Sequence, residues 1–550
     1  MSIRRDLEAH GHARIARSNS MERRRFLKVA AAVATASGVR PGALTAEDGR
    51  QPFSLQEAQE SLVPLGNGEP PALQFQAYPG GTGALIERLW REDGGIPWGR
   101  QMINTGPWTG PAPTNSADIA FLPAHRLGAL IRGRKITSEE LTDIYLERMK
   151  KYDPILLCAV TILEDRAREE AKKADAELRA GRWRGPLHGV PWGVKDLFSV
   201  TGARTTWGSS DFENQMINED SELVVRLREA GAVLIAKLAT GEFASGSNWY
   251  RGQTRNAWNP EQSSSGSSAG PGSATAAGLV GFSIGTETRG SIVGPSRRGG
   301  LSALRPTFGR ISRHGGMVLA WSMDKPGPMC RSIEDCAIVF NAIHGSDSKD
   351  PATLTAPFRF ERRPDLSRMR IGYTEDAPEA FVGKLRELGA DPKPMAELPE
   401  SGSSGLGVES SAAFDFHVAP GGVLESVPES AEGEEARTPR FHRGRTVLAL
   451  DFIQSQRRRR ILMQEMAKAM EGFDMFVTGS GETGLTNETG HPAAVLPYDF
   501  GDANTEDDFD HEQPICTTII GDLFADDKIL SVAHAYQSVT DWHQQHPDLT

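Results

Sequence analysis

The chain is poor in cysteine, with four among 550 residues. These are Cys158, Cys330, Cys336 and Cys516, and even the closest two have five residues between them. Such spacing fits neither a zinc-ligand pattern nor the dense disulfide framework of a small secreted domain. We therefore expect four thiols that pack as small buried hydrophobic side chains.

Positive charge is not in excess either. Lys and Arg number 61 against 72 Asp and Glu, which gives a formal net charge of −11. An acidic chain of this kind lacks the basic footprint of a nucleic-acid-binding protein. With 38% hydrophobic and 24% charged residues, the composition is that of a soluble globular protein. The length permits one large α/β unit with additions.

Long apolar runs are also missing, so no stable membrane span is expected. The apolar stretch 29–39 is well short of the roughly 20 residues that cross a bilayer. It follows RRRFLK at 23–28, and a basic patch before a short apolar run is the layout of an export signal. The pattern resembles the twin-arginine type, which delivers folded proteins. We expect residues 1–46 to direct the protein to the periplasm or another extracytoplasmic space. The alternative, a disordered basic tail, would leave it cytoplasmic.

Regular patterning begins after an irregular extension. Residues 47–115 are rich in Gly, Pro and Trp without clear periodicity. Beyond them, Thr137–Glu140 has capping-box spacing before a helical pattern, and 223–236 forms a helix–glycine–strand unit. Such alternation predicts an α/β domain, here 116–550, with a partly parallel sheet. Pro, Gly, Ser and Glu dominate about 395–440, which indicates a variable, mobile insertion.

A lysine interrupts the apolar segment Gly189–Phe198. Solvated lysines do not normally stand between Val194 and Leu197. Burial disfavours the charged form and lowers the pKa, so that a neutral amine becomes available as a general base. The competing interpretation is that Lys195 pairs with Asp196 or another carboxylate, and the segment alone leaves both open.

A Gly/Ser loop, Ser263–Gly270, comes before a helix of small residues. As a flexible linker it would be unremarkable. Gly266–Gly270 formally matches the G-x-S-x-G nucleophile elbow, but that motif follows a buried strand. The preceding residues, PEQSS at 260–264, do not form such a strand. We therefore exclude an elbow at Ser268.

Residues 285–295, GTETRGSIVGP, surround Ser291 with glycines that permit tight turns. The consecutive N–H groups exposed by such turns can bind a developing oxyanion. No histidine is near to activate the serine, but a neutral lysine can serve as the base of a serine nucleophile.

In this order, the three segments resemble the amidase signature family of serine hydrolases. The family pattern is a VKD lysine, a Gly/Ser loop and a G-T-[DE]-x-x-G-S-I nucleophile loop. Flanking motifs agree with it: ARTTWGS at 203–209, LRPT at 304–307, DKPGPM at 324–329 and NETGHP at 487–492. The similarity covers about 120–345 and about 447–545.

The resemblance implies an amidase-signature fold, in which a mixed, largely parallel twisted β-sheet is covered by helices on both faces. It implies hydrolysis of a small-molecule carboxamide to a carboxylate and ammonia or amine, without metal or organic cofactor. Ser291 would form the acyl-enzyme, neutral Lys195 would be the base, and Ser267, in a cis-peptide conformation, would bridge them with Ser268 as hydrogen-bonding support. The oxyanion would be bound by the backbone N–H groups of Thr288, Arg289, Gly290 and Ser291.

Departures from the family pattern carry information of their own. Arg289 stands where the family often has Gly or Asp, and its side chain could line the pocket and favour an anionic substrate. Pro271-Gly272 interrupts a run that is usually rich in alanine, which predicts a distorted helix start.

Two other functions stay open. Val293 replaces the arginine of the G-S-I-R-x-P version found in the glutaminase-type subunit of a tRNA amidotransferase. This residue, the acidic charge and the export signal count against that alternative enzyme. The non-enzyme alternative is an inactive binding protein with the same fold, although all three triad residues are present. The oligomeric state is open, a homodimer being one possibility.

Overall fold

The computed structural model describes residues 87–89, 91, 100–402, 405–418, 441, 444–502 and 512–549. The chain divides into two units, Met1–Pro64 and Leu65–Thr550, and all described residues belong to the second. The expected export signal (1–46), most of the extension (47–115), and 403–404 and 419–440 of the expected insertion lie outside the described residues. Within the described ranges, no helix combines the length and apolarity that a bilayer crossing requires.

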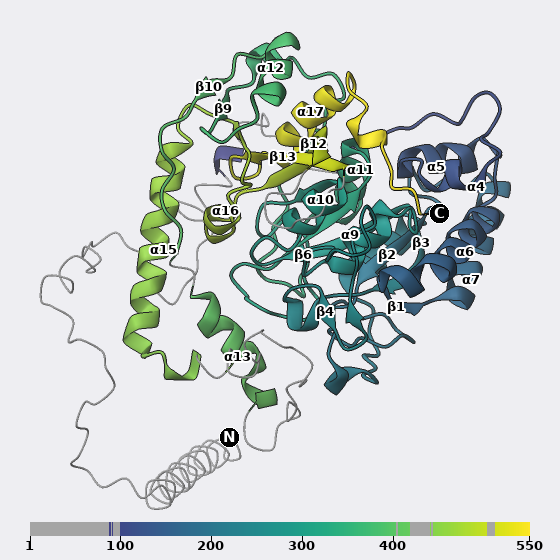
Figure 1. Ribbon diagram of the computed structural model, residues 1–550, viewed down its shortest axis with the longest axis horizontal. Coiled ribbons are helices and arrows are strands. Elements are labelled where there is room, and N and C mark those ends of the chain that lie inside the picture. Colours follow the sequence, from purple (N-terminus) through teal and green to yellow (C-terminus); the bar gives the residue numbers. More distant parts are fainter. Residues whose placement is uncertain are drawn as a thin grey trace, which may run out of the picture. The chain divides into compact units, whose positions relative to one another are not determined.

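Helices and strands alternate along the described ranges (Figure 1). The helices are α4 Ser116–Ala120, α5 Ala124–Arg132, α6 Ser138–Leu156, α7 Glu164–Arg179, α8 Glu222–Glu229, α9 Ala269–Ala276, α10 Val293–Gly299, α11 Ile333–Ile343, α12 Glu379–Glu387, α13 Leu406–Val418, α15 Ala449–Ala469, α16 Thr483–Thr489 and α17 Asp526–Gln537. The strands are β1 Ala159–Ile162, β2 Pro191–Lys195, β3 Val233–Leu238, β4 Asn248–Trp249, β5 Gly252–Gln253, β6 Phe282–Glu287, β7 Ser302–Arg305, β8 Lys325–Cys330, β9 Ile371–Tyr373, β10 Lys393–Pro394, β11 Met475–Thr478, β12 Ala493–Asp502 and β13 Glu512–Gly521.

Eleven of these strands form one mixed sheet in the order β1-β3-β2-β6-β8-β7-β12-β13-β11-β9-β10, and β4 pairs with β5 separately. Parallel pairing occurs in two groups, β3–β2–β6 and β11–β9–β10. The other neighbours in the sheet pair antiparallel. The α/β class with a mixed central sheet, expected from the sequence, is confirmed.

Helices cover both faces of this sheet. The chain passes from β2 through α8 to β3, and from β3 through α9 to β6 on the other side of β2. Because such crossovers are right-handed and these two run in opposite directions along the sheet, α8 and α9 lie on opposite faces. Helix α11 contacts α8 and α17, whereas α10 contacts α9. The groups at the ends of β2 and β6 therefore lie between two helical layers.

Local sequence explains where the helices begin. At α6, Thr137 Oγ1 accepts a hydrogen bond from the Glu140 N–H at 3.1 Å, and the Glu140 carboxylate accepts one from the Thr137 N–H at 2.8 Å, as the capping-box spacing predicts. Helix α9 runs without a break from Ala269 to Ala276. Pro271 lies in its first turn, where backbone N–H groups have no acceptor within the helix. The residue before the helix, Ser268, has a ψ of 50° and makes no side-chain cap hydrogen bond.

The four cysteines are free and buried, as expected for small hydrophobic side chains.

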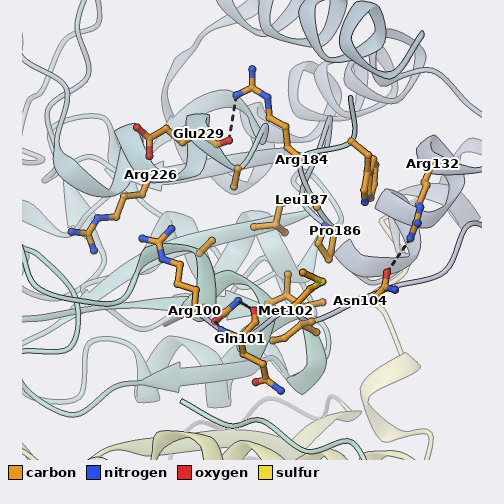
Figure 2. A pocket seen from close by; sticks show the side chains of 17 residues that line it. Arg100, Gln101, Met102, Asn104, Arg132, Arg184, Pro186, Leu187, Arg226 and Glu229 are labelled. Carbon is orange, nitrogen blue, oxygen red and sulfur yellow. Dashed lines mark hydrogen bonds between the residues drawn. The ribbon is translucent and has the colours of Figure 1, made fainter. Parts of the chain in front are cut away.

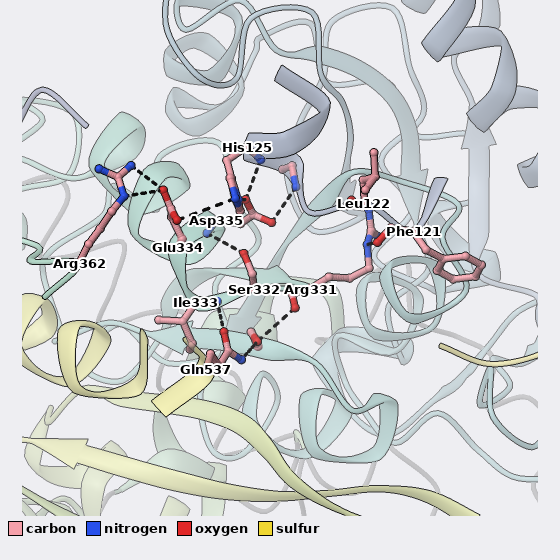
Figure 3. A network of polar contacts seen from close by, with 12 residues as sticks. Phe121, Leu122, His125, Arg331, Ser332, Ile333, Glu334, Asp335, Arg362 and Gln537 are labelled. Carbon is pink, nitrogen blue, oxygen red and sulfur yellow. Dashed lines mark hydrogen bonds and ion pairs between the residues drawn. The ribbon is translucent and has the colours of Figure 1, made fainter. Parts of the chain in front are cut away.

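A polar network joins the starts of α5 and α11 (Figure 3). Asp335 accepts hydrogen bonds from the N–H groups of Ala124 and His125 at 2.7 and 2.8 Å, and a His125 ring nitrogen lies 2.8 Å from the same carboxylate. Arg362 Nε donates to Glu334 at 2.8 Å. Although burial opposes it, the negative charges of Asp335 and Glu334 raise the pKa of His125. The network therefore ties the first helices of the domain to the layer over β7 and β8.

Candidate functional site

Lys195 is the last residue of β2 and is fully buried. Its Nζ lies 2.8 Å from Ser267 Oγ, 3.1 Å from Ser268 Oγ and 2.8 Å from Thr286 Oγ1. Burial lowers the pKa of Lys195 well below its ordinary value, against the weaker opposing attraction of Asp324 and Glu287. The amine is thus surrounded by three hydroxyl groups at the carboxyl end of a parallel strand.

The neighbouring carboxylate is engaged elsewhere. Among the ion pairs of the described residues, Asp196 pairs with Lys237 at 2.7 Å, with both side chains fully buried. Asp196 also accepts a hydrogen bond from the Thr206 N–H at 2.8 Å. Of the two interpretations that the sequence left open, the geometry therefore excludes pairing of Lys195 with Asp196.

The Gly/Ser loop is fixed against β6. The Gly266–Ser267 peptide is cis, as the family resemblance implied. A Cβ at Gly266 would stand 1.9 Å from the carbonyl oxygen of Gly246, so glycine is required there. Ser268 Oγ accepts a hydrogen bond from the Thr286 N–H at 3.1 Å and donates one to the Thr286 carbonyl at 3.0 Å. These contacts hold the loop in one position against β6, so it is not a flexible linker.

Ser291 lies in the loop after β6, which turns at Gly290 with φ of +83°. The Ser291 carbonyl accepts a hydrogen bond from the Ser268 N–H at 3.2 Å, so the two serine loops adjoin. None of the backbone N–H groups from Thr288 to Ser291 donates a hydrogen bond to another described residue. A row of open donors beside a serine is the arrangement that binding of an oxyanion requires.

Glu287 fixes the chain that follows Ser291. Its carboxylate accepts hydrogen bonds from the N–H groups of Ile292 and Val293 at 2.7 and 2.9 Å. It also accepts from Arg305 Nη1 at 2.9 Å and from Asn487 Nδ2 at 2.6 Å. Burial alone would raise the pKa of Glu287, but Arg305 and these hydrogen bonds lower it to about 2. Two of the motifs that carried the resemblance, LRPT and NETGHP, therefore meet at one carboxylate.

Two further residues of the site were not anticipated. Thr286 holds Lys195, as described above. Asp324 accepts a hydrogen bond from Thr288 Oγ1 at 2.6 Å and from the N–H groups of Leu319 and Ala320 at 2.8 and 3.0 Å, and burial raises its pKa. The motif DKPGPM contains Asp324, but nothing in that motif indicates the partners of its carboxylate.

A cavity of about 340 Å³ adjoins the nucleophile loop. Its lining includes Thr286, Thr288 and Asp324, but neither Ser267 nor Ser291. An apolar cluster packs next to this cavity, and Phe414 of helix α13 belongs to it. The composition had predicted a mobile insertion where α13 lies. The buried members are Leu197, Phe212, Phe243, Ala244, Leu319, Phe414 and Phe441.

Arg289 is exposed and is not among the residues that line this cavity. Its Nη2 comes within 3.1 Å of the position that a Cβ would take at Gly484. The guanidinium therefore lies beside the start of α16, at the rim of the nucleophile loop.

The family model named Amidase matches residues 140–484 of the chain. A glutamyl-tRNA(Gln) amidotransferase subunit from Roseiflexus sp. (strain RS-1) is 33% identical, across 76% of this chain and 96% of that protein. The solved structure of the native peptide amidase from Stenotrophomonas maltophilia is 29% identical, with a TM-score of 0.66 over 76% of this chain and 96% of that one. An amidase family protein from Bacillus anthracis str. Ames has a TM-score of 0.70 over 79% of this chain and 94% of that one, and at 23% identity it shows the fold alone. A match that spans the lysine, both serine loops and the strands β1 to β11 means that the chain belongs to the amidase family.

Proposed function

We propose that this amidase hydrolyses the C–N bond of a small or medium carboxamide, with Ser291 as nucleophile and Lys195, acting through Ser267, as base. The observation that carries the proposal is the 2.8 Å contact between Lys195 Nζ and Ser267 Oγ. Because burial lowers the pKa of Lys195, its amine can accept a proton at a pH where a solvated lysine is charged.

The hydrogen bonds around Lys195 select Ser267 as the proton donor. A neutral amine has two N–H donors and one lone pair. Ser268 Oγ already donates to the Thr286 carbonyl, so toward Lys195 it acts as an acceptor. Thr286 Oγ1 is a second acceptor at 2.8 Å. With both N–H groups engaged in this way, the lone pair is left for the hydroxyl hydrogen of Ser267.

The reaction then has two halves. As Ser291 Oγ bonds to the carbonyl carbon, its proton passes to Ser267 Oγ, whose own proton passes to Lys195 Nζ. The carbonyl π electrons move to oxygen, and the resulting oxyanion is stabilised by the open N–H groups of 288–291. The C–N bond breaks as the proton on Lys195 returns through Ser267 to the leaving nitrogen. Water then attacks the acyl-enzyme by the same relay, which releases the carboxylate and restores Ser291.

A serine-reactive fluorophosphonate probe tests these roles. The wild type should label, S291A should not, and K195A should label at least 100-fold more slowly, because a general base contributes about 10²–10⁴ in rate. S273A is the matched control, since Ser273 is a buried serine of α9 without a role in the relay. Labelling of S291A at the wild-type rate would overturn the assignment.

For the substrate, we propose that Arg289 favours an amide with a negative charge. Its guanidinium is exposed beside the nucleophile loop, and the reaction steps need only its backbone N–H. The ratio of kcat/KM for an acidic over a neutral amide should fall at least tenfold in R289A. It should stay unchanged in R363A, which removes an arginine outside the site. An unchanged ratio in R289A would show that the side chain does not select substrate.

A second candidate, the glutaminase subunit of a tRNA amidotransferase, is favoured by the Roseiflexus relative, which carries the name of such a subunit. Val293, in place of the arginine typical of that subunit, argues against it. Ammonia release from glutamine that requires a partner chain would establish this candidate, whereas hydrolysis of simple amides by the isolated chain would exclude it.

We also propose export of the protein by the twin-arginine route. The support is the run RRRFLK at 23–28 before a short apolar stretch. The wild type should be found outside the cytoplasm in shortened form, and mass spectrometry of its new amino terminus gives the cleavage site. R23K/R24K should stay cytoplasmic at full length, whereas the matched pair R4K/R5K should be exported. Export of R23K/R24K at the wild-type level would refute this route.

A further inference from the structure

A second cavity, of about 570 Å³, lies at the amino-terminal ends of β2 and β3 (Figure 2). Its lining residues Leu187 and Ala230 stand just before these strands, which begin at Pro191 and Val233. Lys195 is at the other end of β2, so the cavity is separate from the serine site. Its volume is within the range of about 300–1,000 Å³ that is usual for small-molecule sites. We call it the arginine cavity.

One wall of the arginine cavity is the segment 100–104, which precedes the span of the family match. Gln101 anchors this wall through four hydrogen bonds. Its N–H donates to Asn341 Oδ1 at 3.2 Å, and Asn341 Nδ2 donates to the Gln101 carbonyl at 2.7 Å. Its side chain donates to the Phe360 carbonyl and accepts from the Phe360 N–H, both at 2.8 Å. The wall is therefore held in place from two sides.

The lining is strongly positive, and Glu229 is its single acidic member. Three of its arginines have partners. Arg226 pairs with Glu222 at 2.8 Å, and its Nη1 and Nη2 donate to the carbonyls of residues 343–346 at 2.7–3.1 Å. Arg184 donates to Glu177 at 2.6 Å, and Arg132 donates to Asn104 at 3.1 Å. The arginines that line the cavity are Arg100, Arg132, Arg184 and Arg226.

Arg100 differs from the other three. No hydrogen bond or ion pair joins it to another described residue, and its guanidinium is directed toward that of Arg226 (Figure 2). Burial and the positive charge of Arg226 lower the pKa of Arg100, against the weaker opposing attraction of Glu229 and Glu222. An anion at Arg100 would accept charge-assisted hydrogen bonds from its guanidinium and would offset the repulsion between the two arginines.

Apart from the amides of Gln101, Asn104 and Asn341, the rest of the lining is apolar. Ile103, Leu187 and Ile338 are buried in the wall. Trp183 lies under the guanidinium of Arg132, whose carbon is 5.5 Å from the ring centroid. We propose that the arginine cavity binds an organic carboxylate with a compact apolar body, the carboxylate on the guanidinium of Arg100 and the body against this apolar wall.

Calorimetric titration of the full chain with 4-phenylbutyrate tests the proposal, with inorganic phosphate and the neutral 4-phenylbutanol as comparison ligands. The wild type should bind 4-phenylbutyrate at least tenfold more tightly than either. R100Q should lose at least tenfold in affinity, because Arg100 is the cation without a partner among the described residues. R368Q is the matched control, since Arg368 is a highly exposed arginine that is not part of the cavity lining.

A second variant, A342F, places a ring in the cavity and should also abolish binding without removing a charge. Arg100 is exposed and Ala342 only half-buried, so both variants should fold, which a melting curve verifies. Equal affinity of R100Q and the wild type would overturn the proposal, because binding would then occur elsewhere, including the serine site. Phosphate binding as tight as that of 4-phenylbutyrate would overturn the part assigned to the apolar wall.

Discussion

Replacement of Glu287 by Gln tests how strongly the carboxylate behind the nucleophile loop stabilises the protein and the site. The substitution keeps the shape of the side chain but removes its charge. Arg305 then stays buried without its anion, although it keeps hydrogen bonds to Thr486 Oγ1 at 2.9 Å and the His491 carbonyl at 2.7 Å. The new amide NH2 cannot accept the hydrogen bonds that one carboxylate oxygen now receives.

Two separate estimates give the loss in the free energy of unfolding that E287Q should cause. Removing one partner of a buried ion pair costs about 3–5 kcal/mol. Separately, a carboxyl pKa of about 2 in the folded state against 4.5 as the ordinary value corresponds to about 3 kcal/mol at neutral pH. Because the folded-state pKa is the lower one, this stabilisation is present above about pH 4.5 and is lost as the pH falls toward 2. Gln does not titrate, so E287Q should not show this loss of stability as the pH falls.

Urea unfolding measures the effect. The free energy of unfolding of E287Q should be about 3 kcal/mol below that of the wild type at pH 7, and the difference should shrink to about 2 kcal/mol at pH 3.5. A difference below about 1 kcal/mol at pH 7, or one that grows as the pH falls, would refute the reasoning.

A second measurement separates positioning from stability. E287Q should label with the fluorophosphonate probe more slowly than its folded fraction explains, because one amide oxygen cannot accept both from the N–H groups of Ile292 and Val293 and from Arg305 and Asn487. E177Q is the matched control: Glu177 is also buried and paired with an arginine, but lies on α7 outside the site. Normal labelling of folded E287Q would show that Glu287 does not position the nucleophile.

The kcat/KM of the wild type should rise with pH along one acid limb, because Lys195 must be neutral to act as base; a kcat/KM that falls as the pH rises from the acid side would contradict that role. G266A should be inactive and melt at lower temperature, since its Cβ would stand 1.9 Å from a carbonyl oxygen, and an active G266A with a normal melting curve would contradict the fit. For His125, whose pKa is raised, the stabilisation is complete below about pH 6.5 and is lost as the pH rises through the folded-state pKa. The difference in the free energy of urea unfolding between H125Q and the wild type should therefore be larger at pH 6 than at pH 9, by about 1.4 kcal/mol for each unit of pKa shift. Equal differences at the two pH values would contradict the assignment of the raised pKa to Asp335.

The sequence predicted those parts of the site that show a recognisable pattern among neighbouring residues. Lys195 stood out because a charged residue interrupted an apolar strand, and Ser291 because glycines surround it, whereas Ser267 came only from the family resemblance. The capping box of α6 was equally visible, since its two partners are three residues apart.

Contacts between segments far apart in the sequence produce no such local pattern. Glu287 is the acidic position of the family pattern, but nothing in that pattern indicated its partners, because these are 18 and 200 positions away. Thr286 is one of several hydroxyl residues near Ser291, and only the path of β6 next to β2 turns it toward Lys195. The arginine cavity joins residue 100 to residues 187 and 341, a juxtaposition that no local pattern encodes. Helix α13 was missed because a Gly- and Ser-rich composition outweighed the signal of Phe414, which packs into the apolar cluster.

The link between Glu287 and Asn487 joins the loop of Ser291 to a residue that is synthesised 200 positions later. A nascent chain that stops short of α16 would contain Lys195, Ser267 and Ser291, the groups proposed to move the proton. It would lack the hydrogen bond from Asn487 and the strands β12 and β13. Fragments cut before α16 should therefore carry these three residues without activity. On the proposed twin-arginine route, which carries folded proteins, hydrolytic competence would arise inside the cell that makes the protein, before it is exported.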